Sequence, residues 1–218
     1  MEITPRRQRT RERLIEAALP VIAEDGVAGA SIECISEAAG MTRGAFYSNF
    51  STKDDLLLAI IDRQISAGLS HVHSIVEGDP MKRSAGLIGS SPTPVSVADR
   101  RDAVTEAITS VFAAKALDPQ EILAERQIEL YVRRVPELQS KFDELVSTHI
   151  TEIAAVIEHA LSAFGGVSRI PLDELVALLA DVTKAAELEA VSRPDPDGRH
   201  TTDPRKTIRV LLAFVDFE

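Results

Sequence analysis

The residues whose chemistry stands out most lie between Thr42 and Asn49, where hydroxyl, guanidinium, phenol and amide groups follow one another closely. At helical spacing, Ala45, Phe46 and Phe50 share an inward face. The outward positions are then Thr42, Arg43, Gly44, Tyr47, Ser48 and Asn49. Groups of these types hydrogen-bond to phosphates and base edges, and a guanidinium suits guanine O6 and N7. The segment therefore predicts a helix that can enter a nucleic-acid groove.

Two further helices are expected to position this segment. Apolar residues repeat at helical spacing from Arg6 to Asp25, and Gly26 ends that pattern. Ser31 caps a short helix over residues 32–39, which Gly40 ends and Thr42 restarts. The two short helices joined at Gly40 predict a helix-turn-helix, with the longer first helix packed beside them. We assign residues 1–53 to this DNA-binding head.

Residues 54–218 are predicted to form a helical body for ligand binding and dimerisation. Its expected helices cover residues 54–76, 99–117, 119–134, 136–164, 172–191 and 204–217. The first of them is expected to begin after Ser51, a capping residue with an acid three positions further on. The Pro- and Gly-rich stretch 78–98 is expected to be a long loop. No segment favours a strand, so the fold is predicted to be all-α with about nine helices.

Composition excludes several classes of protein. The single cysteine, Cys34, rules out an intrachain disulfide and a cysteine-based zinc site and favours a reducing compartment, with the cytoplasm as the expected location. His71 and His73 point to different sides of a helix, so no metal or other cofactor is expected. No secretory signal or membrane span is evident.

A net charge of −10 argues at first against a DNA partner, but its distribution reduces the objection. Residues 1–53 carry seven Lys or Arg against seven acids, whereas residues 54–218 carry 17 against 27. The expected layout is a neutral head with a basic N-terminal arm and an acidic body. Binding of DNA by the head alone is compatible with it.

The segment GVAGASIECISEAAGMTRGAFYSNFSTKDDLLLAI resembles the signature of TetR-type transcriptional regulators. The resemblance assigns Ser31 and Thr42 to phosphate contact, and places Lys53 where the family uses a phosphate-binding lysine. Arg43 is the expected base reader. Gly44 and Ala45 would permit close approach to DNA, and Tyr47 and Asn49 could reach a phosphate or a base edge. Glu33 departs from the family pattern, in which a basic residue is common, and it is expected to repel the DNA backbone.

The same positions have a simpler interpretation as solvated turn residues of a helical bundle, which the joint agreement of their spacings disfavours. Cys34, in the first turn of a helix, could sense oxidants, although an ordinary small residue is the default. In the body, a ligand pocket between helices is expected, with Gln127, Tyr131 and His149 as candidate polar contacts. Satisfied core or rim positions are the commoner role for such residues.

The helices at 172–191 and 204–217 are apolar over more than one face, which predicts a homodimer. The interface residues expected on them are Leu175, Leu179, Val182, Ala186, Leu211 and Phe214. The alternative is that both helices belong to the core of a monomer.

The function that the sequence favours is a dimeric repressor that leaves operator DNA when a small molecule binds to the body. An activator of the same architecture remains open, because the sign of regulation depends on operator position. An enzyme with a vestigial head is the remaining alternative, and no catalytic motif supports it.

Overall fold

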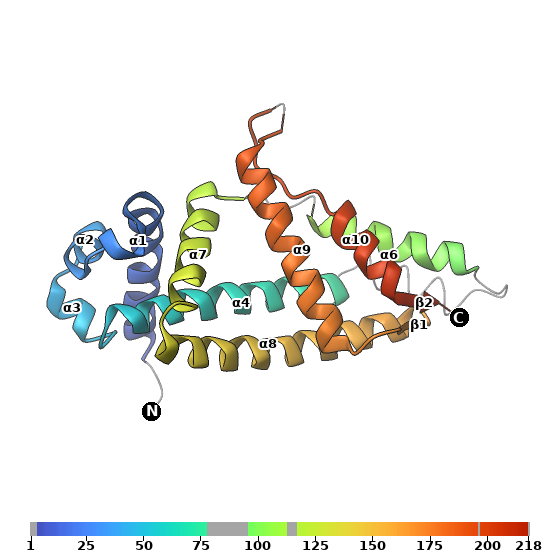
Figure 1. The fold of residues 1–218 in the computed structure, drawn as a ribbon, viewed down its shortest axis with the longest axis horizontal. Helices are drawn as coiled ribbons and strands as arrows, with labels where there is room; N and C mark the ends of the chain where they lie inside the picture. The colour runs from blue at the N-terminus through green and yellow to red at the C-terminus, as the bar shows by residue number, and fades with distance from the viewer. Residues whose placement is uncertain (1–3, 78–95, 113–116, 196, 218) are drawn as a thin grey trace. The chain divides into compact units, whose positions relative to one another are not determined.

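The computed structural model describes residues 4–77, 96–112, 117–195 and 197–217, and within them the protein has nine α-helices and two short strands (Figure 1). The helices are α1 (Pro5–Gly29), α2 (Ile32–Ala38), α3 (Arg43–Tyr47), α4 (Lys53–Glu77), α6 (Val97–Phe112), α7 (Pro119–Val132), α8 (Pro136–Ala163), α9 (Leu172–Ser192) and α10 (Arg205–Phe214). The predicted mostly helical fold with an N-terminal helix-turn-helix is confirmed. Residues 78–95, most of the predicted loop, and residues 113–116 lie outside the described residues, and α6 begins at Val97, inside the predicted loop.

Helix starts follow local capping chemistry. The side chains of Ser31, Thr42 and Asp118 accept backbone N–H bonds at the first turns of α2, α3 and α7. Before α4 the cap is Thr52, which exchanges backbone-to-side-chain hydrogen bonds of 3.1 Å with Asp55. The predicted cap, Ser51, was therefore one residue early, because the acid that closes the reciprocal pair is Asp55.

The contacts divide the chain into two compact units. Unit 1 comprises Met1–Ile65 and Asp118–Leu145, and unit 2 comprises Ser66–Leu117 and Val146–Glu218. These units do not follow the 53/54 boundary, because α7 packs against α1. The division of function between residues 1–53 and 54–218 stays a prediction.

Unit 1 encloses the core that supports α3. The fully or almost fully buried apolar side chains of this core come from α1 to α4 and from α7. They include Leu14, Ile22, Ile35, Phe46, Phe50, Leu56, Leu57, Ile60 and Ile128. The inward positions predicted for Phe46 and Phe50 are confirmed, and Ala45 is half-buried. The three head helices thus share one closely packed apolar core, and this core determines which face of α3 points outward.

Unit 2 contains a small sheet that the sequence pattern did not indicate. Strand β1 (Gly166–Ser168) pairs antiparallel with β2 (Val215–Phe217), with Gly166 opposite Phe217. A Cβ at Gly166 would lie 3.2 Å from the side chains of Phe217 and Val215, so glycine allows this close approach. The predicted helix at 204–217 therefore ends at Phe214.

No helix among the residues that the structure describes is long and apolar enough to cross a membrane.

Candidate nucleic-acid interface

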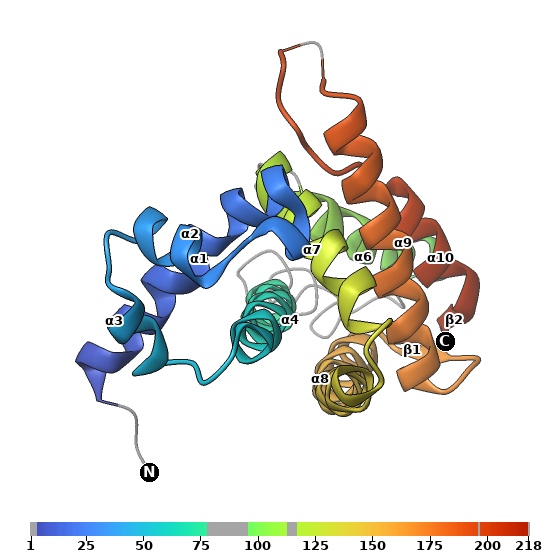
Figure 2. The ribbon, with the colours of Figure 1, turned by 60° about the vertical axis from the view of Figure 1, so that its left-hand side comes forward.

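Helices α2 and α3 form a helix-turn-helix whose turn is made by Gly40 (Figure 2). Gly40 has φ +64°, a left-handed conformation that favours glycine after a helix. Ile35 and Ala39 of α2 and Phe46 of α3 are buried on the inner side of the motif. The opposite side of α3 is left at the surface.

The first turn of α3 presents the polar groups that the sequence placed there. Thr42, Arg43 and Gly44 are exposed, and Tyr47 is 49% exposed. The Thr42 hydroxyl accepts a hydrogen bond of 3.2 Å from the backbone N–H of Ala45, itself half-buried. Because a hydroxyl has a further lone pair and its own donor, it can cap the helix and still contact a phosphate. This turn combines accessible hydrogen-bonding groups with a rigid apolar base.

Asn49 does not face outward as predicted. It is 9% exposed, and its amide donates to the carbonyl oxygen of Ala45 at 2.8 Å. Its Oδ1 atom is buried without a hydrogen-bond partner. The assignment failed because Asn49 follows the last turn of α3, where the chain bends inward toward Phe50. The expected outward position was therefore wrong, and DNA contact by Asn49 stays an untested prediction.

Glu33 and Arg43 form an ion pair between α2 and α3. Glu33 Oε1 lies 2.6 Å from Arg43 Nη1, and both side chains are more than half exposed. The guanidinium carbon of Arg43 lies 6.0 Å from the centroid of the Tyr47 ring. Hydrogen bonding to Tyr47 and the charge of Glu33 both raise the pKa of Arg43. The sequence pattern identified Glu33 only as a repulsive charge and missed this pairing.

Ser31 has the expected position at the N-terminus of α2. Its hydroxyl oxygen accepts a bond of 3.1 Å from the Cys34 N–H, and its own proton is directed toward Cys34 Sγ, also at 3.1 Å. Cys34 is exposed. Phosphate contact by Ser31 and oxidant sensing by Cys34 both stay predictions.

Lys53 binds protein carbonyls. Its Nζ donates to the carbonyl oxygens of Val27 and Ala30, at 2.7 and 3.2 Å. These carbonyls follow Gly26, where α1 breaks with φ +73°. The ammonium thereby ties the start of α4 to the C-terminal end of α1. An ammonium has three donors, so phosphate contact by Lys53 stays a prediction, but its contacts here are structural.

Two arginines of the predicted basic arm are also engaged with the protein. Arg11 donates to the Asn49 carbonyl at 2.6 Å and stacks 4.1 Å from the Phe50 ring centroid. Burial, and then the like charge of Arg7, lower the pKa of Arg11. Arg13 donates to the Ala39 carbonyl at 3.0 Å. Cations placed at helix C-termini in this way complement the helix dipoles.

The spacing could have revealed the role of Arg11. It lies three, four and seven residues before Leu14, Ile15 and Ala18, all of which are buried. The partner carbonyls were not predictable, because they come from residues 26 and 38 positions further along the chain. Arg6, Arg7 and Arg9 are exposed on the first turns of α1.

The three residues suggested for ligand contact all have protein partners. Gln127 donates to the Ala23 carbonyl at 3.3 Å, and Tyr131 donates to Asp54 Oδ1 at 3.4 Å. Burial, and next the charge of Asp54, raise the pKa of Tyr131. The ring Nε2 of His149, which is buried, lies 3.3 Å from the Ser66 hydroxyl. These contacts fit the alternative of satisfied core or rim positions, and a ligand role for each stays untested.

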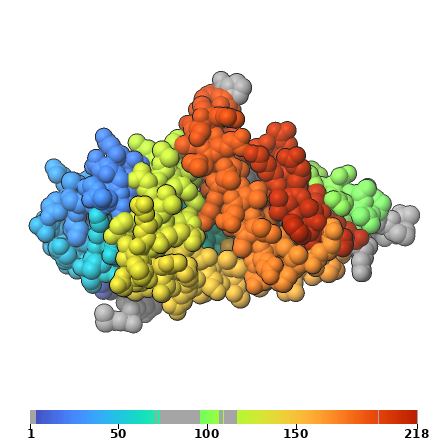
Figure 3. All heavy atoms as spheres, viewed as in Figure 1, coloured from blue at the N-terminus to red at the C-terminus, as the bar shows by residue number. Residues whose placement is uncertain are grey.

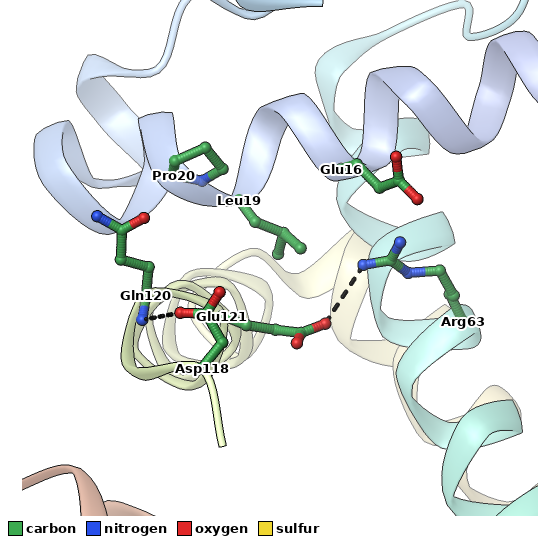
Figure 4. A pocket seen from close by; sticks show the side chains of 7 residues that line it. All are labelled: Glu16, Leu19, Pro20, Arg63, Asp118, Gln120 and Glu121. Atoms are coloured by element: carbon green, nitrogen blue, oxygen red, sulfur yellow. Dashed lines mark hydrogen bonds and ion pairs between the residues drawn. The ribbon is translucent and has the colours of Figure 1, made fainter. Parts of the chain in front are cut away.

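A pocket of about 410 Å³ lies in unit 1, and none of these three residues lines it (Figure 4). In Figure 4, Arg63 of α4 reaches the carboxylate of Glu121 on α7, with N–O separation 3.4 Å. The lining is mostly polar and acidic. It consists of Glu16, Leu19, Pro20, Arg63, Asp118, Gln120 and Glu121.

The predicted dimer residues mostly lie inside unit 2. Leu175 and Leu211 belong to its buried core, with Phe164, Val215 and Phe217, and Leu179 and Phe214 pack against that core. Ala186 is 4% exposed and Val182 is half-buried. Leu175, Ala186 and Leu211 are therefore covered within the chain, and their predicted place in a dimer interface stays untested. Helices that are apolar on several faces do not reveal which face is covered within one chain.

A buried three-helix core under an exposed, hydrogen-bonding helix end defines a helix-turn-helix DNA-binding protein. Residues 14–60 match the family model for bacterial regulatory proteins of the tetR family. The helix-turn-helix of this chain is that of the TetR family of transcriptional regulators. This is a family of regulators and not of enzymes, which excludes the enzyme alternative.

Individual relatives agree with this assignment. The chain is 27% identical over 172 residues to the HTH-type transcriptional repressor AcnR of Corynebacterium glutamicum, covering 78% of this chain and 90% of AcnR. Other curated relatives match over 52 to 73 residues, and the chain covers between 25% and 39% of their length.

Solved structures share the fold over almost the whole chain. A TetR-family regulator from Mesorhizobium loti has a TM-score of 0.59 at 15% identity, covering 96% of this chain and 95% of that one. The multidrug binding protein EbrR, solved with imidazole, has a TM-score of 0.55 at 20% identity, covering 99% of this chain and 95% of that one.

Proposed function

We propose that the protein is a homodimeric, cytoplasmic transcriptional repressor that binds operator DNA through α3 and leaves it when a small molecule binds. The observation that carries this proposal is the exposed first turn of α3, with Arg43 at the surface over a buried apolar base. AcnR, which aligns over 90% of its length, is named a repressor, and this favours a repressor over an activator. The name of EbrR supports the ligand step.

In this proposal α3 enters the major groove with its N-terminal turn nearest the bases. The Thr42 hydroxyl and the free N–H groups of the first turn bind phosphate, helped by the positive end of the helix dipole. Gly44 and the half-buried Ala45 add little bulk, so the helix end can approach the DNA closely. Arg43 donates to guanine O6 and N7, which fixes the base at one position of each half-site.

The dimer is proposed to form through a face of α9 different from the one first expected. Leu178 and Leu188 are 41% and 43% exposed, and exposed Ala185 lies between them at helical spacing. Helix α9 lies at the surface beside α10 in Figure 3. An apolar stripe of this kind is a candidate for an isologous two-fold contact. Two heads would then read a palindrome with half-sites roughly 34–36 Å apart.

Selection from a library of randomised DNA duplexes tests the reading function without knowledge of the operator. The wild-type chain is expected to enrich a palindromic motif that contains a preferred guanine in each half-site. Arg43→Ala should reduce the preference for this guanine by about 5- to 150-fold, which is the discrimination that one bidentate arginine provides. Arg134→Ala, an exposed arginine outside the head, is the matched control. An unchanged motif with Arg43→Ala would contradict base reading by Arg43.

Light scattering at micromolar concentration tests the dimer. The wild-type protein should have twice the chain mass of 23.6 kDa. Leu178→Glu should shift the measured mass toward that of the monomer. Ala180→Glu, which changes an exposed residue on another side of α9, should leave the mass unchanged. A monomeric wild-type protein would rule out the dimer.

The ligand step is testable once a motif has been selected. Small aromatic nitrogen bases, imidazole among them, and organic acids can be added one at a time to the protein–DNA complex. Release of DNA without chemical change of the compound supports the proposal. If ligand binding is detected by thermal unfolding and leaves the DNA affinity unchanged, the ligand step fails.

A further inference from the structure

The ion pair between Glu33 and Arg43 lies on the surface that the proposed function assigns to DNA. The side chains are 53% and 59% exposed, and the N–O distance is 2.6 Å. An exposed pair of this kind contributes little to stability. The packing of α2 on α3 is instead provided by Ile35, Ala39 and Phe46, which are buried. The pair is therefore available for a role other than holding the two helices together.

The geometry orients Arg43 from two sides. Glu33 Oε1 contacts the Nη1 nitrogen of the guanidinium, and the Tyr47 ring lies 6.0 Å from its central carbon. A guanidinium has five N–H donors in a planar fork. Glu33 contacts Nη1, and a guanidinium has further N–H donors that can form two hydrogen bonds to a guanine edge. An arginine that is already oriented loses less conformational freedom when it binds guanine.

The charge of Glu33 has a second effect. It compensates the charge of Arg43, so the pair adds little to the attraction that any DNA sequence exerts on cations. Its carboxylate would also repel a phosphate oxygen that approached Arg43. A guanine edge, which presents neutral acceptors, meets less repulsion. The ion pair therefore favours base contact over phosphate contact.

We propose that Glu33 is a positioning residue that directs Arg43 to guanine and away from phosphates, and so sets the specificity of the head. The inference rests on the proposed DNA-reading function, which it deepens at one residue. What the sequence pattern indicated as an obstacle to DNA binding thereby becomes part of the reading surface.

The test repeats the duplex selection with the full-length Glu33→Gln variant. Its preference for the guanine that Arg43→Ala loses is expected to fall at least about threefold, a part of the 5- to 150-fold that the arginine itself provides. Binding to a scrambled duplex should tighten, because one repulsive charge is removed. The melting temperature should not change, since the pair is exposed.

Glu37→Gln is the matched control, because Glu37 is an exposed acid of the same helix and the charge change is identical. It should tighten scrambled-duplex binding while leaving the guanine preference intact. The double variant Glu33→Gln/Arg43→Ala should show no further loss of guanine preference beyond Arg43→Ala alone, because Glu33 acts through Arg43.

Two results would overturn the inference, and they differ in what else they affect. If the wild-type protein selects a motif whose guanine preference is the same with Glu33→Gln, Glu33 does not position Arg43, and the proposed function stands. If the wild-type protein selects no motif, the proposed function fails together with the inference.

Discussion

The inner and outer sides of the head use cations in opposite ways. Facing the protein's own backbone, Arg11, Arg13 and Lys53 donate to carbonyls and join α1 to the ends of α2 and α3 and to the start of α4, although Arg13 is itself exposed. On the outer side, Arg43 is exposed beside a carboxylate at the tip of α3. The contrast shows that a count of basic residues overestimates the charge available to DNA, because carbonyls inside the protein compete for the same donors.

The largest loss of stability is expected when Lys53 is replaced. Lys53→Met keeps the apolar stem but removes the donor for two carbonyls, so the free energy of unfolding should fall by about 2–3 kcal/mol. Denaturant unfolding measures it. If stability is unchanged while DNA binding weakens for every sequence and the salt slope falls by about one, Lys53 acts as a phosphate contact instead.

A smaller effect is expected at Arg11. Arg11→Lys retains the charge but loses the planar stacking on Phe50, and it should destabilise the protein by about 1 kcal/mol. Denaturant unfolding is again the measurement. The salt dependence of DNA binding should stay the same, because Arg11 is engaged with the protein. If Arg11→Lys instead reduced the salt dependence of DNA binding and left the stability unchanged, Arg11 would be a DNA contact.

The smallest effect on stability is expected at Arg9, which serves as the matched exposed arginine of the same helix. Arg9→Ala should change the free energy of unfolding by less than about 0.5 kcal/mol. If Arg9 contacts a phosphate, the slope of log affinity against log salt should decrease in magnitude by about 0.9. Fluorescence anisotropy at several salt concentrations tests it. A loss of stability would show that Arg9, too, is structural.

The sequence predicted the head better than the C-terminal helices, and the reason is physical. In α2 and α3 a single apolar stripe, including Ile35 and Phe46, faces inward, so the polar side is determined. In α9 and α10 apolar residues occupy several faces. The sequence could not tell that Leu175 and Leu211 are buried within the chain while Leu178 is exposed.

Other misses come from contacts between residues far apart in sequence. The pairing of Gly166 with Phe217 joins three-residue strands, which are too short to show an alternating pattern. The Lys53 contacts with Val27 and Ala30 depend on tertiary structure alone. Asn49 was misplaced because a helical face was extended beyond the last turn of α3, which ends at Tyr47.

The break in α1 at Gly26 also limits which substitutions the head can tolerate. Its φ of +73° is strained for residues with a Cβ, and a Cβ there would lie 3.3 Å from Gln127 Oε1 on α7. Among random single substitutions, those at position 26 should therefore be depleted nearly without regard to side-chain type. The nearby exposed positions Asp25 and Ala28 should accept most replacements. Position 26 is therefore expected to be intolerant of substitution between exposed positions that accept it, because only a residue without a Cβ fits its backbone conformation.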